Sequence, residues 1–155
     1  MSAIKSFLLA IEMATRKRDQ ASQGLMQAQN AYLFAQDQMN QLQTYAAETE
    51  SRWTTAAQIS TSTEMLRHHY QFMGRLQHAM DLQKGALENE TRKVALAKKG
   101  VLDAEFRLVS LKQVLEKKQA DLAVLQARRE QKQMDEFASM RRPQFSDDYS
   151  SGDRS

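Results

Sequence analysis

Histidine is the residue type in this sequence that most invites a metal or proton-transfer role, and it occurs as His68, His69 and His78. Cysteine is absent, so no thiolate could complete a zinc site or act as a nucleophile. His68 and His69 are adjacent, and adjacent residues of a helix point about 100° apart. We therefore interpret these histidines as solvated or as lying at the edge of a helix-packing seam.

Carboxylates and glycines give no better candidate for catalysis. The 19 Asp and Glu residues are scattered along the chain, whereas acid–base catalysis needs a concave site that excludes water. Phosphate-binding loops need clustered glycines. The five glycines are isolated, at Gly24, Gly74, Gly85, Gly100 and Gly152. We predict that the protein is not an enzyme and binds no cofactor or metal.

Paired basic residues raise nucleic acid as a partner. They occur at Lys98-Lys99, Lys117-Lys118, Arg128-Arg129 and Arg141-Arg142. Acidic residues interleave with these pairs, and no aromatic stacking platform accompanies them. The formal net charge is only +3. We expect no nucleic acid partner, although a nucleic-acid binder remains an alternative.

The N-terminal residues 4–18 could also touch a membrane surface, because Phe7, Leu8 and Leu9 precede the basic run of residues 16–18. Glu12 ends the apolar run that begins at Phe7, so we expect no secretory signal. No stretch approaches the ~18 apolar residues of a membrane span. With no disulfide framework, we expect a cytoplasmic protein.

The sequence pattern indicates that helices position the histidines, carboxylates and basic pairs considered above. Five glycines and one proline in 155 residues, with abundant Ala, Gln, Leu, Lys and Glu, are typical of a nearly all-helical chain. Apolar residues recur every seven positions, which indicates a coiled coil. The first register comprises the series from Ile4 to Trp53 and its companion from Phe7 to Ala56. The second comprises the series from Leu66 to Leu122, apolar throughout, and a companion from His69 to Leu125.

Residues 58–63, "QISTST", separate the two registers and lower helix propensity. Thr61 and Glu64 have the spacing of a capping box. We predict an all-α fold for residues 1–142, a long two-helix antiparallel coiled-coil hairpin with helices at about 4–57 and 62–139. Paired residue numbers should then sum to about 121. Residues 121–140 would overhang without a partner, and residues 143–155 would form a disordered tail.

Two segments of this hairpin resemble the FliJ family of bacterial flagellar export proteins. One is "YQFMGRLQHAM", residues 70–80, just after the turn, and the other is "EQKQMDEFASMRRP", residues 130–143. The box from Lys132 to Ala138, followed by basic residues, is the more specific of the two. Together with length, helix order and turn position, the resemblance covers about residues 1–143.

The resemblance implies a non-enzymatic component of the type III export apparatus, peripherally associated with the inner membrane at the flagellar base. In that family the hairpin is similar to the central stalk of rotary ATPases. Its paired terminal ends sit in the export ATPase hexamer FliI, with FliH nearby. The other end binds the cytoplasmic domain of the export gate protein FlhA, and the family escorts export chaperones.

The family's gate-contacting positions are matched here near the turn. Thr49 and Gln83 depart from that pattern, where the family has tyrosine and histidine. By the predicted pairing, the matching residues form one patch across both helices. Leu42 and Leu76 also occupy seam positions, so they could be core residues instead of contacts. The matching residues are Gln38, Leu42, Tyr45, Phe72, Leu76 and Ala79.

The predicted overhang presents apolar residues that no intramolecular helix covers, and an ATPase ring would cover them. Its arginines would meet acidic ring surfaces, and Pro143 would stop the helix where contact ends. A frayed terminus is the alternative. The expected ring-binding residues are Leu122, Leu125, Arg128, Arg129, Met134, Asp135, Glu136, Phe137, Arg141 and Arg142.

Two alternative functions remain open. A stalk protein of a virulence type III secretion system would share the hairpin, although the Asp135-Glu136-Phe137 box favours the flagellar branch. A generic cytosolic coiled-coil adaptor is the other.

Overall fold

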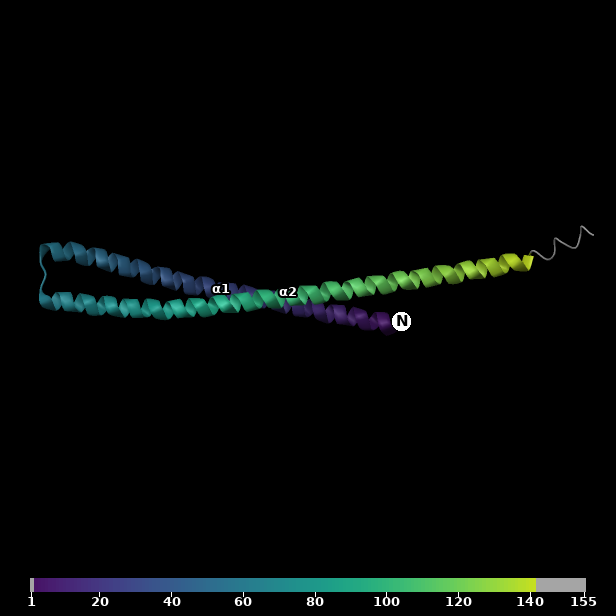
Figure 1. The fold of residues 1–155 in the computed structure, drawn as a ribbon, viewed down its shortest axis with the longest axis horizontal. Coiled ribbons are helices and arrows are strands. Elements are labelled where there is room, and N and C mark those ends of the chain that lie inside the picture. The colour runs from purple at the N-terminus through teal and green to yellow at the C-terminus, as the bar shows by residue number, and fades with distance from the viewer. Residues whose placement is uncertain (1, 142–155) are drawn as a thin grey trace, which may run out of the picture. The chain divides into compact units, whose positions relative to one another are not determined.

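Residues 2–141 form two long α-helices joined by a short turn, as Figure 1 shows. The computed structural model describes residues 2–141. Helix α1 spans Ser2–Ile59 and helix α2 spans Thr63–Arg141. Ser60, Thr61 and Ser62 are the only described residues outside a helix. The all-α fold is therefore confirmed, and no β-strand occurs between residues 2 and 141. The predicted tail, residues 143–155, lies outside the described residues.

The turn, residues 60–62, differs from the sequence prediction in the residue that caps α2. The backbone N–H of Met65 donates a hydrogen bond to Ser62 Oγ at 3.2 Å. The N–H of Leu66 donates to the Ser62 carbonyl oxygen at 3.0 Å. Ser62 is thus the N-cap, and the prediction of Thr61 was wrong by one residue. Glu64 instead lies in the first turn, where a carboxylate is favoured by the helix dipole.

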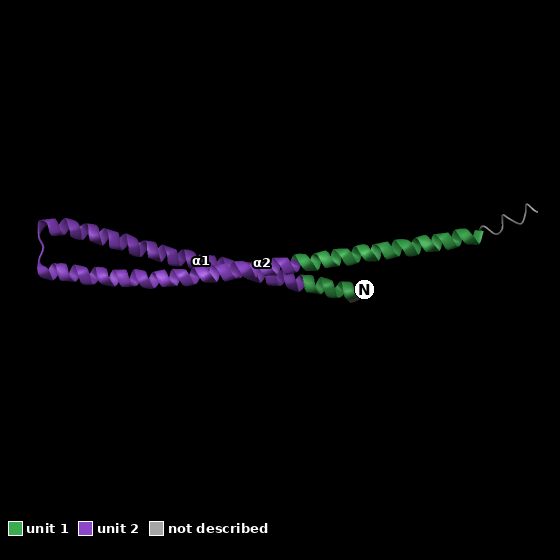
Figure 2. Cartoon of the chain, viewed as in Figure 1, with its two compact units in different colours: residues 1–11, 109–155 green, residues 12–108 purple. Residues whose placement is uncertain are grey.

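The chain divides into two compact units, coloured in Figure 2. Unit 2 comprises Glu12–Leu108 and unit 1 combines Met1–Ile11 with Val109–Ser155. In unit 2, α1 and α2 run antiparallel and pack along one seam. Its buried residues are Ala14, Ala35, Ala46, Leu76 and Leu108. Small residues on α1 face larger ones on α2, which permits close packing of the helices.

The predicted register agrees with the observed burial. Along α1, every predicted seam position from Ile4 to Trp53 is buried or half-buried. Ala56 is exposed, and Ala57 is half-buried at the seam instead. An α-helix has 3.6 residues per turn, so a strict seven-residue repeat drifts around it. Along α2, the first predicted position, Leu66, is exposed, and the predicted positions are covered from His69 to Leu115.

Contacts between the helices fit the predicted pairing. The Tyr45 and Phe72 rings meet edge to face at 5.9 Å, and Trp53 stacks on His69 at 4.4 Å. In unit 1, the Lys118 ammonium lies 4.5 Å from the centre of the Phe7 ring. In each pair the residue numbers sum to within about four of 121, as an antiparallel hairpin with this turn requires.

Unit 1 contains the segment of α2 that α1 does not cover. Leu115 is the last buried residue of α2, and every described residue after it is exposed. Leu122 and Leu125 continue the apolar series but are 48% and 49% exposed. The predicted overhang therefore begins shortly after Lys118, the residue that contacts Phe7.

Candidate interaction surfaces

The first surface lies in unit 2, where Tyr45 of α1 and Phe72 of α2 meet across the seam. Tyr45 is 48% exposed and Phe72 is half-buried. Edge-to-face geometry is favourable for an aromatic pair, and it leaves much of the Tyr45 ring in solvent. Of the two predicted gate residues that could also be core, Leu76 is 8% exposed and lies in the seam. Leu42 is half-buried.

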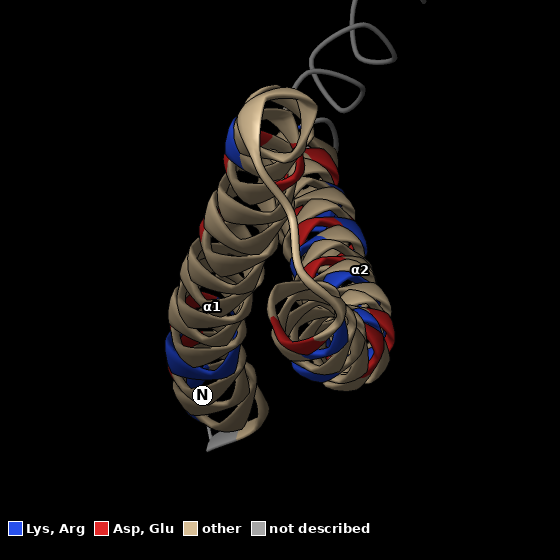
Figure 3. Cartoon of the chain, turned by 90° about the vertical axis from the view of Figure 1, so that its left-hand side faces the viewer, with Lys and Arg blue, Asp and Glu red and all other residues tan. Residues whose placement is uncertain are grey.

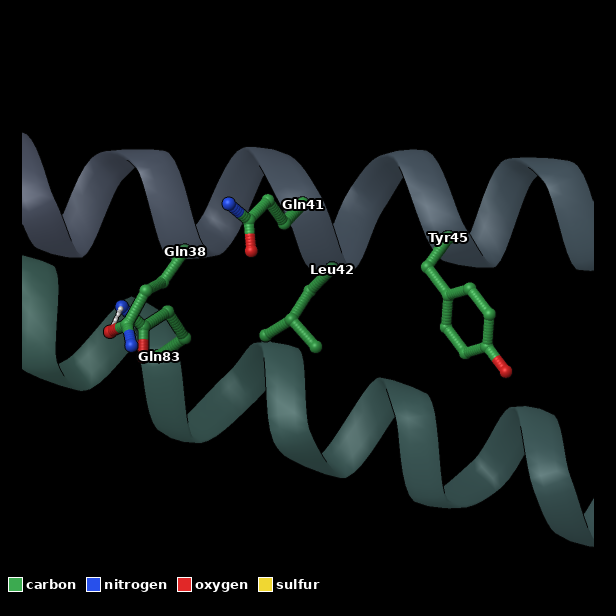
Figure 4. A pocket seen from close by; sticks show the side chains of 5 residues that line it. All are labelled: Gln38, Gln41, Leu42, Tyr45 and Gln83. Carbon is green, nitrogen blue, oxygen red and sulfur yellow. Dashed lines mark hydrogen bonds between the residues drawn. The ribbon is translucent and has the colours of Figure 1, made fainter.

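Two glutamine side chains, Gln38 and Gln41, lie on the turns of α1 before Tyr45, and Gln83 of α2 lies opposite Gln38, as Figure 4 shows. Gln83 Nε2 of α2 donates a 2.7 Å hydrogen bond to the Ala35 carbonyl oxygen of α1. The same nitrogen lies 3.4 Å from Gln38 Oε1. Gln38, Gln41, Leu42, Tyr45 and Gln83 together line a shallow pocket. A polar side chain in a coiled-coil seam fixes the register of the helices, so Gln83 holds Gln38 and the pocket in place.

The predicted gate residues lie on both helices, and the structure brings Gln38, Tyr45 and Phe72 to one surface. Ala79 is half-buried on α2. Gln41 was not singled out, although it lies one turn after Gln38 and three residues is the spacing of helical neighbours. Gln83 was noted only as a departure from the family pattern. Its hydrogen bond to α1 depends on tertiary structure that periodicity does not reveal.

A second pocket in unit 2 lies closer to the turn. His69 Nε2 lies 3.1 Å from Glu50 Oε2, and the His69 side chain is 8% exposed. Its ring stacks on Trp53 with an interplanar angle of 7°. The interpretation of His69 as a seam histidine is therefore correct. The pocket is lined by Thr49, Arg52, Trp53, Ala56, Met65, His68 and His69.

The other candidate surface lies in unit 1, on the uncovered part of α2. Met134 and Phe137 are 70% and 60% exposed, and with Glu130 and Gln133 they line a shallow pocket. The Arg141 guanidinium lies 4.8 Å from the centre of the Phe137 ring, a cation–π distance.

The remaining residues predicted to bind the ring also lie on this exposed helix. Gln131 Nε2 donates to Asp135 Oδ1 at 3.1 Å, and Ser139 Oγ donates to the Glu136 carbonyl oxygen at 2.9 Å. Arg128 and Arg129 are exposed. Arg142 lies outside the described residues. Residues 122–141 therefore present apolar and charged groups on one uncovered helix.

Charged residues are distributed unequally between the helices. Figure 3 shows α1 largely free of Lys, Arg, Asp and Glu, whereas both signs alternate along α2. Between residues 20 and 47, Asp37 is the only charged residue. The ion pairs Arg16–Glu12 and Lys93–Glu90 are local, and all of their members except the half-buried Glu90 are exposed. Such pairs contribute little to stability.

No group of His, Cys, Asp and Glu residues that could hold a metal ion occurs within residues 2–141. Over the same part of the chain, neither helix has an apolar stretch long enough to cross a membrane. The two helices, their packed seam and the surfaces described above define a coiled-coil protein whose candidate binding groups are exposed side chains.

The family model described as Flagellar FliJ protein matches residues 5–143. The chain therefore belongs to the FliJ family, and the resemblance noted in its sequence is confirmed. This family is a non-catalytic component of the export apparatus, so the chain has a flagellar, export-related role. No curated protein matches the sequence.

Proposed function

We propose that this chain is the coiled-coil stalk of the flagellar export apparatus. In this proposal, the uncovered part of α2 occupies the centre of the FliI ATPase ring, with FliH nearby. The surface around Tyr45 and Phe72 binds the cytoplasmic domain of the export gate protein FlhA. The protein also escorts export chaperones and associates peripherally with the inner membrane at the flagellar base.

One observation carries the proposal: residues 122–141 remain helical although no residue of α1 covers their apolar side chains. Leu122, Leu125, Met134 and Phe137 are all about half or more exposed. Exposed apolar groups beside charged ones are typical of protein interaction sites. An ATPase ring with an apolar and acidic axial surface would cover the leucines and pair with Arg128, Arg129 and Arg141.

The gate-binding part of the proposal is supported by the Tyr45–Phe72 pair and its bordering pocket. Aromatic side chains often contribute most of the binding energy at protein interfaces. Tyr45 presents its exposed ring, and Gln38 and Gln41 offer amide donors and acceptors beside it. This surface lies in unit 2 and the ring-binding surface lies in unit 1.

Two variants of the intact chain test whether the two surfaces act independently. Replacing Gln38, Tyr45 and Phe72 by alanine should weaken binding to the purified FlhA cytoplasmic domain and leave stimulation of the FliI ATPase unchanged. Truncation after Leu125 should have the reverse effect, because it removes Met134, Phe137 and the arginines. Circular dichroism should show that both variants remain helical.

A matched control is Tyr70→Ala, because Tyr70 is 68% exposed and lies on α2 close to Phe72. We expect this variant to keep both activities. Loss of both activities in either test variant, with helicity preserved, would contradict two independent surfaces. Tight RNA binding without binding to either export protein would overturn the proposal.

A further inference from the structure

The seam of unit 2 has two lateral sides, and its pockets identify which residues share a side. Gln38, Gln41 and Tyr45 line one pocket, and Arg52, Met65 and His68 line another closer to the turn. In a coiled coil, residues seven positions apart lie on the same side. Both pockets fall on one side by this rule, which we name the Tyr45 side.

Two further exposed apolar residues belong to the Tyr45 side. Phe34 lies one heptad before Gln41, and Leu82 lies two heptads after His68. Their exposed fractions are 65% and 64%. Neither residue contributes to the seam, so packing of the hairpin does not account for them. Phe34 lies four residues before Gln38 and extends the Tyr45 side past the pocket, whereas Leu82 lies next to Gln83 at the level of the pocket.

The opposite side has a different chemical character. It is marked by the pocket that Tyr32, Thr91, Ala95 and Lys98 help to line. Residues seven positions apart share a side, so Lys84, one heptad before Thr91, belongs to this side. Glu88 and Asp81, one and two heptads before Ala95, belong to it as well.

The Tyr45 side carries only Arg75 as a charge on α2 between Phe72 and Asn89. On α1 between residues 20 and 47, the single charged residue is Asp37, which accepts a 3.1 Å hydrogen bond from Gln41 Nε2. An exposed surface that is apolar and nearly uncharged is typical of an interface core.

We infer that Phe34 and Leu82 are further contact residues for the export gate, extending its binding surface from the Tyr45–Phe72 pair along the Tyr45 side to the helix turns that hold Leu82 and Phe34. This inference rests on the proposed function of the Tyr45–Phe72 surface, with which the two residues are continuous. The partner surface that fits these two side chains is apolar, because a charged group placed against them would be desolvated away from Arg75, the one charge of α2 on this stretch of the Tyr45 side.

The test uses the intact chain and the purified cytoplasmic domain of FlhA, with affinity measured by calorimetry. The double variant Phe34→Ala with Leu82→Ala should weaken binding by about tenfold or more. Because the lost contacts are apolar, that factor should be the same at low and high ionic strength.

The chain offers a matched control on the opposite side. Leu33 precedes Phe34 on α1, where successive residues point about 100° apart, and it is 58% exposed. Leu102 lies one heptad after Ala95 and is 65% exposed, close to the 64% of Leu82. The double variant Leu33→Ala with Leu102→Ala removes similar apolar area and should leave gate binding unchanged.

Comparison with the variant Tyr45→Ala with Phe72→Ala separates the inference from the proposed function. If that variant weakens binding but Phe34→Ala with Leu82→Ala does not, the extension is wrong and the gate-binding function stands. If neither weakens binding, the gate-binding function itself is wrong. Equal weakening by the control variant would overturn the assignment of the gate contacts to the Tyr45 side. If Phe34→Ala with Leu82→Ala lost only chaperone binding, the inference of gate contacts would also be wrong.

Discussion

At the scale of single residues, Gln83 is the polar side chain that joins the helices beside the candidate gate-binding surface. Its Nε2 donates to the carbonyl oxygen of Ala35 at 2.7 Å. That carbonyl lies inside α1, where the helix already supplies it with a backbone donor. The glutamine therefore adds a contact that specifies the pairing of the helices, while it occupies a seam position that an apolar residue could fill.

We predict opposite effects for two substitutions at Gln83. Gln83→Leu should leave the free energy of unfolding unchanged or raise it by up to about 1 kcal/mol, because it adds apolar burial at the seam. Gln83→Ala should lower it by about 1 kcal/mol, since it removes both the hydrogen bond and the packing. Urea unfolding followed by circular dichroism measures both. A loss of more than about 1 kcal/mol in Gln83→Leu would mean that the amide contact outweighs apolar burial.

At the scale of the elements, the close approach of α1 to α2 depends on small residues. Ala14 and Ala35 are buried, and Ala21 and Ala28 are half-buried on the same face of α1. On α2, Val101 is half-buried at the seam near the level of Ala21. A large side chain at this level has no space unless the helices separate.

The substitution Val101→Trp should therefore destabilise the hairpin by about 1–3 kcal/mol through overpacking. Lys112→Ala, at an exposed position of α2, should change stability by less than about 0.5 kcal/mol. Thermal unfolding of the two variants compares them directly. Equal melting temperatures would show that the seam does not pass through Val101.

Much of the element scale could be predicted because heptad spacing depends on the sequence alone. The seam from Ile4 to Trp53 followed from that spacing, and the uncovered Leu122 and Leu125 followed from the pairing sum of about 121. The N-cap did not, because Ser60, Thr61 and Ser62 all carry hydroxyls and only the backbone path selects Ser62. The Trp53–His69 stack was also missed, because two aromatic rings in a seam can pack in several orientations.

At the scale of the whole molecule, the chain combines a seam that buries small apolar residues with a helix segment that buries none. Among residues 3–141, every residue that is buried as a whole is Ala or Leu, and no Asp, Glu, Lys or Arg is buried. The seam thus stabilises the hairpin through apolar packing. The uncovered segment, residues 122–141, instead presents exposed groups to solvent. Membership of the FliJ family gives these features an export-related setting.

Because every residue from 126 to 141 is exposed, removal of this segment should leave the hairpin intact. We expect truncation after Leu125 to keep the melting temperature of the full chain to within about 2 °C, since no tertiary packing is lost. The mean helicity per residue should also be retained. A clear fall in melting temperature, measured by circular dichroism at the same protein concentration, would show that the segment stabilises the hairpin itself.

The Trp53–His69 stack also bears on the order in which the helices come together during folding. His69 meets Glu50 only 19 residues away in sequence, whereas Gln83 meets Ala35 across 48. The entropy lost in closing a loop grows with its length, so the contacts beside Ser60–Ser62 form at the lowest entropic cost. The aromatic stack lies where chain closure is easiest. The hairpin should therefore zip from the turn outward, and the Phe7–Lys118 contact should be the last to form.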